Sequence, residues 1–204
     1  MSHEVEIGRG KRGRRAYTLD DIALVPARRT RDPEDVNVGW QIDAYHVDIP
    51  LMAAPMDSVM SPETAIAFGR LGGIGVLDLD GLSTRYEDPE PILDQIAHLG
   101  EEESIATLQR VYSEPIKPAL ITERLKQLRE AGVVVAGKLS PQRVQQHWRA
   151  VVDAGVDLFI IRGSTVSAEH GSSRREPLNL KRFIYELDVP VIVGGVGTDT
   201  AALH

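Results

Sequence analysis

The chain of 204 residues has a mass of 22.4 kDa, is 42% hydrophobic and 26% charged, and contains no cysteine. This composition indicates a soluble globular protein and excludes a disordered chain, a disulfide scaffold, a zinc ribbon and a thiolate nucleophile within these residues. No apolar stretch approaches the roughly 20 residues that a membrane span needs, and no signal segment opens the chain. We therefore expect a cytoplasmic protein that does not act at a membrane.

The formal net charge of −7 is unevenly distributed. Residues 1–31 carry eight basic and four acidic residues, whereas the rest of the chain carries 15 basic and 26 acidic ones. A basic run such as 8–15 is able to contact nucleic acid phosphates, but no interleaved aromatic residues accompany it. We interpret the run as a solvated arm and predict no nucleic-acid partner.

Five short apolar runs follow one another along the chain, and none alternates with polar residues. Continuous runs of this kind are typical of parallel strands that are buried on both faces. The five runs are 49–56, 74–79, 133–135, 158–161 and 189–193. Stretches with helical periodicity lie between them, so the order strand, helix, strand, helix predicts an α/β protein.

The same start signal opens three of the predicted helices: a cap residue followed by proline and then by Glu or Gln. It occurs at 61–63, 88–90 and 140–142. Glycines stand where helices should end, at positions suited to a left-handed C-cap. These glycines are Gly72 with Gly73, Gly100, Gly132 and Gly155.

The strand spacing of about 35 residues is close to that of a (β/α)₈ barrel, which typically needs about 250 residues. We therefore expect a partial TIM barrel with about five of its eight strands, ending as a fifth helix begins at 198–204. Residues 1–48 form the basic N-terminal arm and lead-in, and residues 49–204 form the N-terminal portion of the barrel. A barrel that stops there exposes an apolar strand at each edge, which predicts aggregation, dimerisation or a longer gene product.

The rival architecture is an open doubly wound sheet, which five strands would complete. Its glycine fingerprint is missing, because Asp57-Ser58-Val59 follows the first predicted strand. We therefore favour the barrel.

Three motifs occur in the order and at the spacing of one known family. They are residues 17–26 (YTLDDIALVP), 49–59 (IPLMAAPMDSV) and 71–75 (LGGIG). With these motifs the chain resembles the IMP dehydrogenase/GMP reductase family. The likeness continues through 154–157 (AGVD) and 189–195 (VPVIVGG), so it covers essentially the whole chain after the first 16 residues.

The chain is most similar to the family members that lack regulatory CBS domains. In the larger dehydrogenases these domains interrupt the barrel after its second strand, and here residues 81–132 are too few to hold them. The resemblance implies a purine nucleotide oxidoreductase, which either oxidises IMP to XMP with NAD, the reaction we favour, or reduces GMP to IMP with NADPH. It further implies a homotetramer and, for the whole family protein, a monovalent cation such as K⁺ whose site does not fall in this chain.

The resemblance also assigns substrate-binding residues one at a time. Met56 matches the methionine that packs against the purine base, a role that suits its polarizable thioether, although without the motif Met56 would be interpreted as barrel core. Asp57 and Ser58 follow it at the C-terminal end of the first strand, the face on which barrel enzymes build their sites. Gly194 and Gly195 match glycines that line the substrate pocket, where a missing Cβ lets a ligand approach the backbone.

Two departures from the family pattern bear on the substrate and the cofactor. Val196 replaces the asparagine that follows the two glycines, so one polar contact to the nucleotide is lost. Where the dehydrogenases carry Asp-Ser-Ser against the nicotinamide ribose, this chain has Arg162, Gly163 and Ser164, with Thr165 next. Arginine cannot accept hydroxyl hydrogens but pairs with phosphate or carboxylate, so the choice between NAD and NADP stays open.

A polar loop at 169–175 follows the fourth predicted strand. We expect it on the active-site face, in contact with the cofactor. An equal alternative for Arg162 is a surface arginine paired with Glu169 of this loop.

The family chemistry uses a cysteine on the loop after the sixth strand, whose thiolate adds to the purine C2. The chain has no cysteine, and the phosphate-binding loops after the seventh and eighth strands would lie beyond His204. No residue is therefore assigned a catalytic role, and we expect these 204 residues to be inactive alone. The alternative class is a non-catalytic nucleotide-binding or assembly partner, which gains thermal stability with IMP or GMP.

Lys138 follows the third predicted strand and suggests a competing enzyme class. A desolvated lysine there would form an imine, as in an aldolase-like barrel. We prefer a structural interpretation, in which Lys138 pairs with Asp78 or Asp80 on the adjacent strand. The six histidines are scattered, with no i, i+4 pair that has Glu between, so we predict no metal site.

Overall fold

A computed structural model describes residues 4–15, 17, 19–25, 28–166, 179–197 and 203. The chain divides into two compact units, Met1–Asn37 and Val38–His204. The polar loop predicted at 169–175 and, apart from Leu203, the helix start predicted at 198–204 lie outside the described residues. In the described part of the chain, no helix is both long and apolar enough to cross a membrane.

The first unit contains one small antiparallel hairpin. Its strands are β1 (Glu4–Glu6) and β2 (Arg12–Arg14), and Arg12 pairs with Glu4 at 3.3 Å on the surface. Two short 3-10 helices follow, η1 (Leu19–Asp21) and η2 (Pro33–Asp35). The hairpin side chains are almost all exposed, so this unit has little core of its own.

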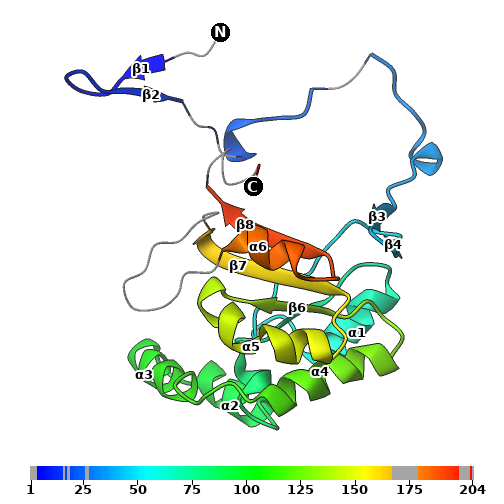
Figure 1. Ribbon diagram of the computed structural model, residues 1–204, viewed down its shortest axis with the longest axis vertical. Coiled ribbons are helices and arrows are strands. Elements are labelled where there is room, and N and C mark those ends of the chain that lie inside the picture. Colours follow the sequence, from blue (N-terminus) through cyan, green and yellow to red (C-terminus); the bar gives the residue numbers. More distant parts are fainter. Residues whose placement is uncertain are drawn as a thin grey trace. The chain divides into compact units, whose positions relative to one another are not determined.

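A four-stranded parallel sheet forms the centre of the second unit (Figure 1). The strands lie in the order β5 (Val76–Asp78), β6 (Ala136–Leu139), β7 (Leu158–Val166) and β8 (Val191–Val196). This order equals their order in the chain, as in a closed barrel, whereas a doubly wound sheet reverses its order. The prediction of an α/β fold with part of a TIM barrel is confirmed.

The first predicted strand, 49–56, is the exception. It forms a single parallel bridge, between Met52 and Ile74, with two backbone hydrogen bonds of 2.9 Å. The next rung of this ladder would need an N–H group at position 55, and Pro55 has none. Among the described residues, the parallel sheet therefore has four strands and one bridge where the sequence predicted about five strands.

A hairpin that the sequence analysis did not predict precedes this bridge. Its strands are β3 (Trp40–Ile42) and β4 (Tyr45–Val47), and Asp43 turns the chain between them with a φ of 49°. Asp is one of the few residues that tolerate this left-handed conformation. The Tyr45 hydroxyl donates to Asp157 Oδ1 at 3.0 Å, which fastens the hairpin to the start of β7.

Helices connect the strands and cover one face of the sheet (Figure 1). They are α1 (Pro62–Arg70), η3 (Leu82–Thr84), α2 (Glu90–Ala97), α3 (Glu101–Val111), α4 (Pro118–Glu130), α5 (Pro141–Asp153) and α6 (Leu180–Tyr185). The three predicted start signals each open a helix, namely α1, α2 and α5. At α1 the Ser61 hydroxyl accepts from Thr64 N–H while the Thr64 hydroxyl accepts from Ser61 N–H, which completes a capping box.

The predicted glycine stops are confirmed at three of the helix ends. Gly72, Gly132 and Gly155 have φ values of 95°, 71° and 78°. The assignment of Gly100 as a left-handed C-cap is wrong. Gly100 has a φ of −67° and is the N-cap of α3, because α3 follows α2 almost immediately.

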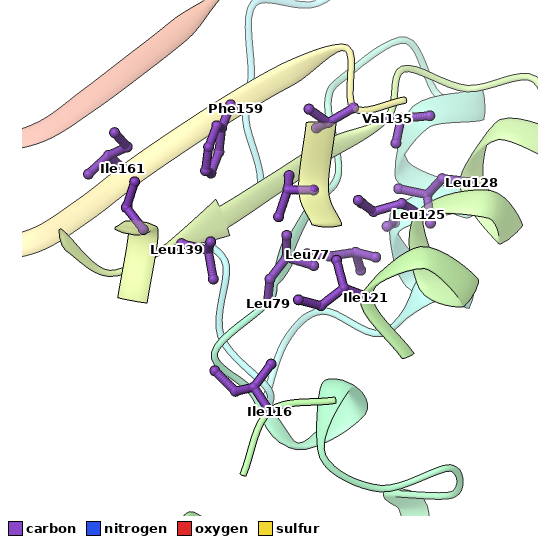
Figure 2. Packing of buried hydrophobic residues seen from close by; sticks show 14 of the residues in the cluster. Leu77, Leu79, Ile116, Ile121, Leu125, Leu128, Val135, Leu139, Phe159 and Ile161 are labelled. Carbon is purple, nitrogen blue, oxygen red and sulfur yellow. The ribbon is translucent and has the colours of Figure 1, made fainter. Parts of the chain in front are cut away.

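The main core lies between the sheet and its covering helices, as Figure 2 shows. Alternate residues of each strand face the helices in this core, as the alternation of side chains along a strand requires. The sheet contributes Leu77, Leu139, Phe159 and Ile161, with Leu79 just past β5, and α4 contributes Ile121, Leu125 and Leu128, all at most 1% exposed. A smaller cluster, which includes Val76, Ala136, Leu158 and Ile160, covers the other face.

Candidate functional site

The predicted substrate residues Met56, Asp57 and Ser58 lie in a turn directly after the bridge segment. Two backbone hydrogen bonds close this turn, from the N–H groups of Val59 and Met60 to Met56 O at 2.9 and 2.8 Å. Met56 is 42% exposed, which excludes its interpretation as barrel core. Asp57 is half-buried and Ser58 is exposed.

The remaining predicted site residues lie together where β7 runs beside β8. Arg162 is opposite Gly194 in the register, and a β-bulge lies between Arg162 and Val166. A Cβ on Gly195 would lie 3.2 Å from Ser164 O, so the two strands approach closely here. The structure therefore brings Gly194, Gly195 and Val196 next to Arg162, Gly163, Ser164 and Thr165. Arg162 is exposed, and its predicted partner Glu169 lies outside the described residues.

Asp57 is held by three neighbours that the sequence analysis did not connect with it. Its Oδ2 accepts from Leu82 N–H at 2.8 Å and from the Tyr112 hydroxyl. Its Oδ1 lies against Gly81, where a Cβ would come within 2.2 Å. The carboxylate is therefore fixed in one position, and only glycine fits beside it.

Tyr112 and Arg85 complete this arrangement. The Arg85 guanidinium lies 5.5 Å from the centre of the Tyr112 ring, in cation–π geometry. Burial, and then the hydrogen bond and negative charge of Asp57, raise the pKa of Tyr112 far above its ordinary value. Tyr112 therefore stays protonated and remains a hydrogen-bond donor across the physiological range.

Lys138, in β6, lies between the carboxylates of Asp78, the last residue of β5, and Asp80, which follows two residues later. Its Nζ is 3.0 Å from Asp78 Oδ1 and 3.1 Å from Asp80 Oδ2. Asp80 Oδ2 also accepts from Ser140 N–H at 2.6 Å, while Asp80 Oδ1 is buried without a hydrogen-bond partner among the described residues. This confirms the preferred structural interpretation of Lys138.

The charges around Lys138 argue against the imine-forming alternative. Burial lowers the pKa of Lys138, but the charges of Asp78 and Asp80 outweigh burial, so the net direction is upward. Burial also raises the pKa of Asp78 against the opposing effect of Lys138. An ammonium held in this way is not a nucleophile.

A cavity of about 140 Å³ opens beside Asp57, between the start of α1, η3 and the start of α2. Acidic side chains dominate its rim, and Arg124 is the one basic residue among the described residues that line it. Ligand pockets of nucleotide size occupy roughly 300–1,000 Å³. This cavity is therefore too small to be a nucleotide pocket.

Tyr112, which contacts Asp57, and Arg85, which packs on the Tyr112 ring, could not be found from the motifs. Tyr112 is 55 residues away along the chain and follows a helix outside the barrel repeat. Arg85 lies after the strand end, in a segment with no motif. Gly81 did carry a sequence signal, because an isolated glycine after a strand often marks a place where another group approaches the backbone closely.

The parallel sheet and its strand order define part of a (β/α)₈ barrel, with polar residues at the C-terminal ends of the strands. The sequence model of the IMP dehydrogenase / GMP reductase domain matches residues 16–204. The chain therefore belongs to the IMP dehydrogenase/GMP reductase family.

Relatives of known sequence or structure agree with this assignment. An uncharacterised oxidoreductase of Mycolicibacterium smegmatis is 46% identical over 205 residues, which cover 98% of this chain and 55% of that protein. An IMP dehydrogenase/GMP reductase-like protein of Corynebacterium glutamicum, whose crystal structure is known, superimposes with a TM-score of 0.89 at 43% identity, over 98% of this chain and 54% of that one. Inosine-5'-monophosphate dehydrogenase of Methanocaldococcus jannaschii is 42% identical over 64 residues, 31% of this chain and 13% of that protein. The chain thus spans about half the length of the relatives that it matches throughout.

Proposed function

We propose that the protein containing these residues is a purine nucleotide oxidoreductase that converts IMP to XMP with NAD. Family membership supports the class of reaction. The observation that carries the substrate is the exposed thioether of Met56, which lies next to the fixed Asp57 carboxylate at the end of the bridge segment. A flat purine base suits a polarizable sulfur, and a carboxylate accepts hydrogen bonds from the hydroxyl or amino groups of a nucleotide.

The residues at 162–165 fit the cofactor only in part. The Arg162 side chain has no hydrogen-bond acceptor, so position 162 cannot hold the ribose hydroxyls as the family's aspartate does. Arg162 is exposed and offers a charge-assisted pair to a phosphate. This exposed cation favours the second candidate, reduction of GMP with NADPH, because NADPH carries an additional phosphate.

The thiolate chemistry of the family has no counterpart within these 204 residues, which contain no cysteine. We therefore expect these residues alone to bind a nucleotide without converting it. For the whole protein, we expect a homotetramer. Reading the coding sequence past His204 tests this directly. A sixth strand followed by a glycine-rich loop with a cysteine supports the enzyme, whereas a stop codon leaves only the binding function.

Calorimetric titration of the chain with IMP and with GMP tests the substrate class. Met56→Ala should weaken the binding of either nucleotide by about tenfold, because the base loses its stacking partner (~1–2 kcal/mol). Val59→Ala is the matched control, since Val59 is similarly exposed at 47% in the same turn and has no assigned role. Equal nucleotide affinity of the wild type and Met56→Ala would show that Met56 does not contact the nucleotide.

A further inference from the structure

The hydroxyl of Tyr112 reaches the candidate substrate site from outside the barrel repeat. Tyr112 is the first residue past α3, and its hydroxyl donates to Oδ2 of Asp57. The same oxygen accepts the Leu82 N–H at 2.8 Å. Two donors from separate segments therefore set the orientation of one carboxylate that directly follows Met56.

Tyr112 is itself held in place. The guanidinium of Arg85 lies 5.5 Å from its ring centre, and Arg85 is only 4% exposed. Arg85 donates twice to Asp80 O, at 3.0 and 3.2 Å, and also to Glu114 O. A buried guanidinium that is held by three hydrogen bonds gives the phenol ring little freedom, so its hydroxyl is pre-positioned toward Asp57.

The hairpin of α2 and α3 is attached to the rest of the unit mainly at this end. α2 buries no residue, and α3 buries only Val111, the residue before Tyr112. Val111 O accepts from the Tyr86 hydroxyl at 3.2 Å. In Figure 1 α3 extends past the helices that cover the sheet.

We propose that Tyr112 is a positioning residue for the nucleotide site: its hydroxyl fixes the Asp57 carboxylate in the orientation that the nucleotide requires. This inference rests on the proposed function of Asp57 as a substrate-binding residue. Tyr112 does not need to touch the nucleotide, because it acts through the carboxylate. Loss of one donor lets the carboxylate rotate away from the position that the ligand requires.

The test compares Tyr112→Phe with Tyr86→Phe. Each variant removes one phenolic hydroxyl at the end of α3, but only the first removes a hydrogen bond to Asp57. Tyr112→Phe also retains the ring beneath Arg85. Calorimetry with IMP and GMP should show affinity about fivefold lower for Tyr112→Phe and unchanged for Tyr86→Phe.

A spectroscopic readout separates this role from a general effect on folding. Alkaline titration of the phenolate absorbance should show a tyrosine with a strongly raised pKa that disappears in Tyr112→Phe and has a lower pKa in Asp57→Asn, which keeps the burial but loses the negative charge. Wild-type affinity in Tyr112→Phe, or an equal loss in Tyr86→Phe, would overturn the positioning role. If the wild type binds neither nucleotide, the proposed function fails and the role of Tyr112 fails with it, whereas the titration would still report the contact.

Discussion

The ammonium group of Lys138 on β6 is bound by both carboxylate oxygens of Asp78 on β5, at 3.0 and 3.3 Å. The side chains are only 13% and 16% exposed, so solvent screens the pair weakly. Removing one member of such a pair leaves an uncompensated charge in a poorly solvated place. The pair therefore stabilises the adjacent C-terminal ends of β5 and β6 and takes no part in nucleophilic chemistry.

Lys138→Met should lower the free energy of unfolding by about 3 kcal/mol, because Asp78 and Asp80 are left facing each other. Lys126→Met is the matched control, since Lys126 pairs with Glu130 at 3.5 Å while both side chains are more than 65% exposed. Its loss should cost at most about 0.5 kcal/mol. Urea unfolding measures both, and equal effects would contradict the structural role of Lys138.

Because His147 is buried with a lowered pKa, we expect the protein to lose stability on mild acidification. His147 is 4% exposed, its Nδ1 has no hydrogen-bond partner in the described part of the chain, and its pKa is lowered by burial and by the charges of Arg143 and Arg85, against Asp80. The unfolded chain takes up this proton near the ordinary pKa of about 6.5, whereas the folded protein takes it up only at lower pH.

The contribution of His147 to stability is therefore present above pH 6.5 and is lost as the pH falls below it. His147→Met should flatten the unfolding free energy in this window relative to the wild type. Parallel curves for the wild type and His147→Met would refute the prediction.

The contact between Gly81 and Asp57 predicts a sharp difference between two glycines. A Cβ at position 81 would lie 2.2 Å from Asp57 Oδ1, whereas a Cβ at Gly100 meets nothing within 4 Å. Gly81→Ala should cost about 1–3 kcal/mol and weaken nucleotide binding, because the carboxylate must move. Gly100→Ala should cost less than about 1 kcal/mol, from the poorer N-cap of α3 alone, and leave nucleotide binding unchanged. Thermal unfolding and IMP titration of both variants check this.

Phe159 joins β7 to the last helix of the described core. Its ring meets Phe183 of α6 edge-to-face, with centroids 6.0 Å apart, and it is fully buried. Phe159→Ala should destabilise the chain by about 3–5 kcal/mol, since the cavity cannot close. Tyr185→Ala, at a ring that is 91% exposed, should have almost no effect. A small loss in Phe159→Ala would show that α6 is not packed on the sheet in solution.

The sequence predicted the features that depend on neighbouring residues. Start signals such as Ser61-Pro62-Glu63 and stops such as Gly155 act within one helical turn, so they can be recognised in one dimension. The apolar runs at 74–79, 158–161 and 189–193 overlap β5, β7 and β8, whereas the run predicted at 133–135 ends just before β6 begins at Ala136. The first run failed as a strand because Pro55 removes a single donor, an effect that hydrophobicity does not register.

The candidate site was only partly predictable for a different reason. Met56, Asp57 and Ser58 lie in a contiguous motif, whereas Tyr112 reaches Asp57 across 55 positions and follows α3, a helix whose start the sequence did not mark. Contacts of this range depend on how elements pack, which periodicity does not encode. Gly100 shows the same limit, since the sequence identified a boundary there but not which helix it belonged to.

The most direct measurement is nicotinamide turnover by the whole protein that contains these residues, followed by the absorbance of the reduced cofactor. With IMP and NAD the absorbance should rise as XMP forms, and Met56→Ala should slow this rise while Val59→Ala should not. Consumption of NADPH with GMP, and not with IMP, would reverse the favoured direction. No turnover and no binding with either nucleotide would contradict the assignment of this site to purine nucleotides.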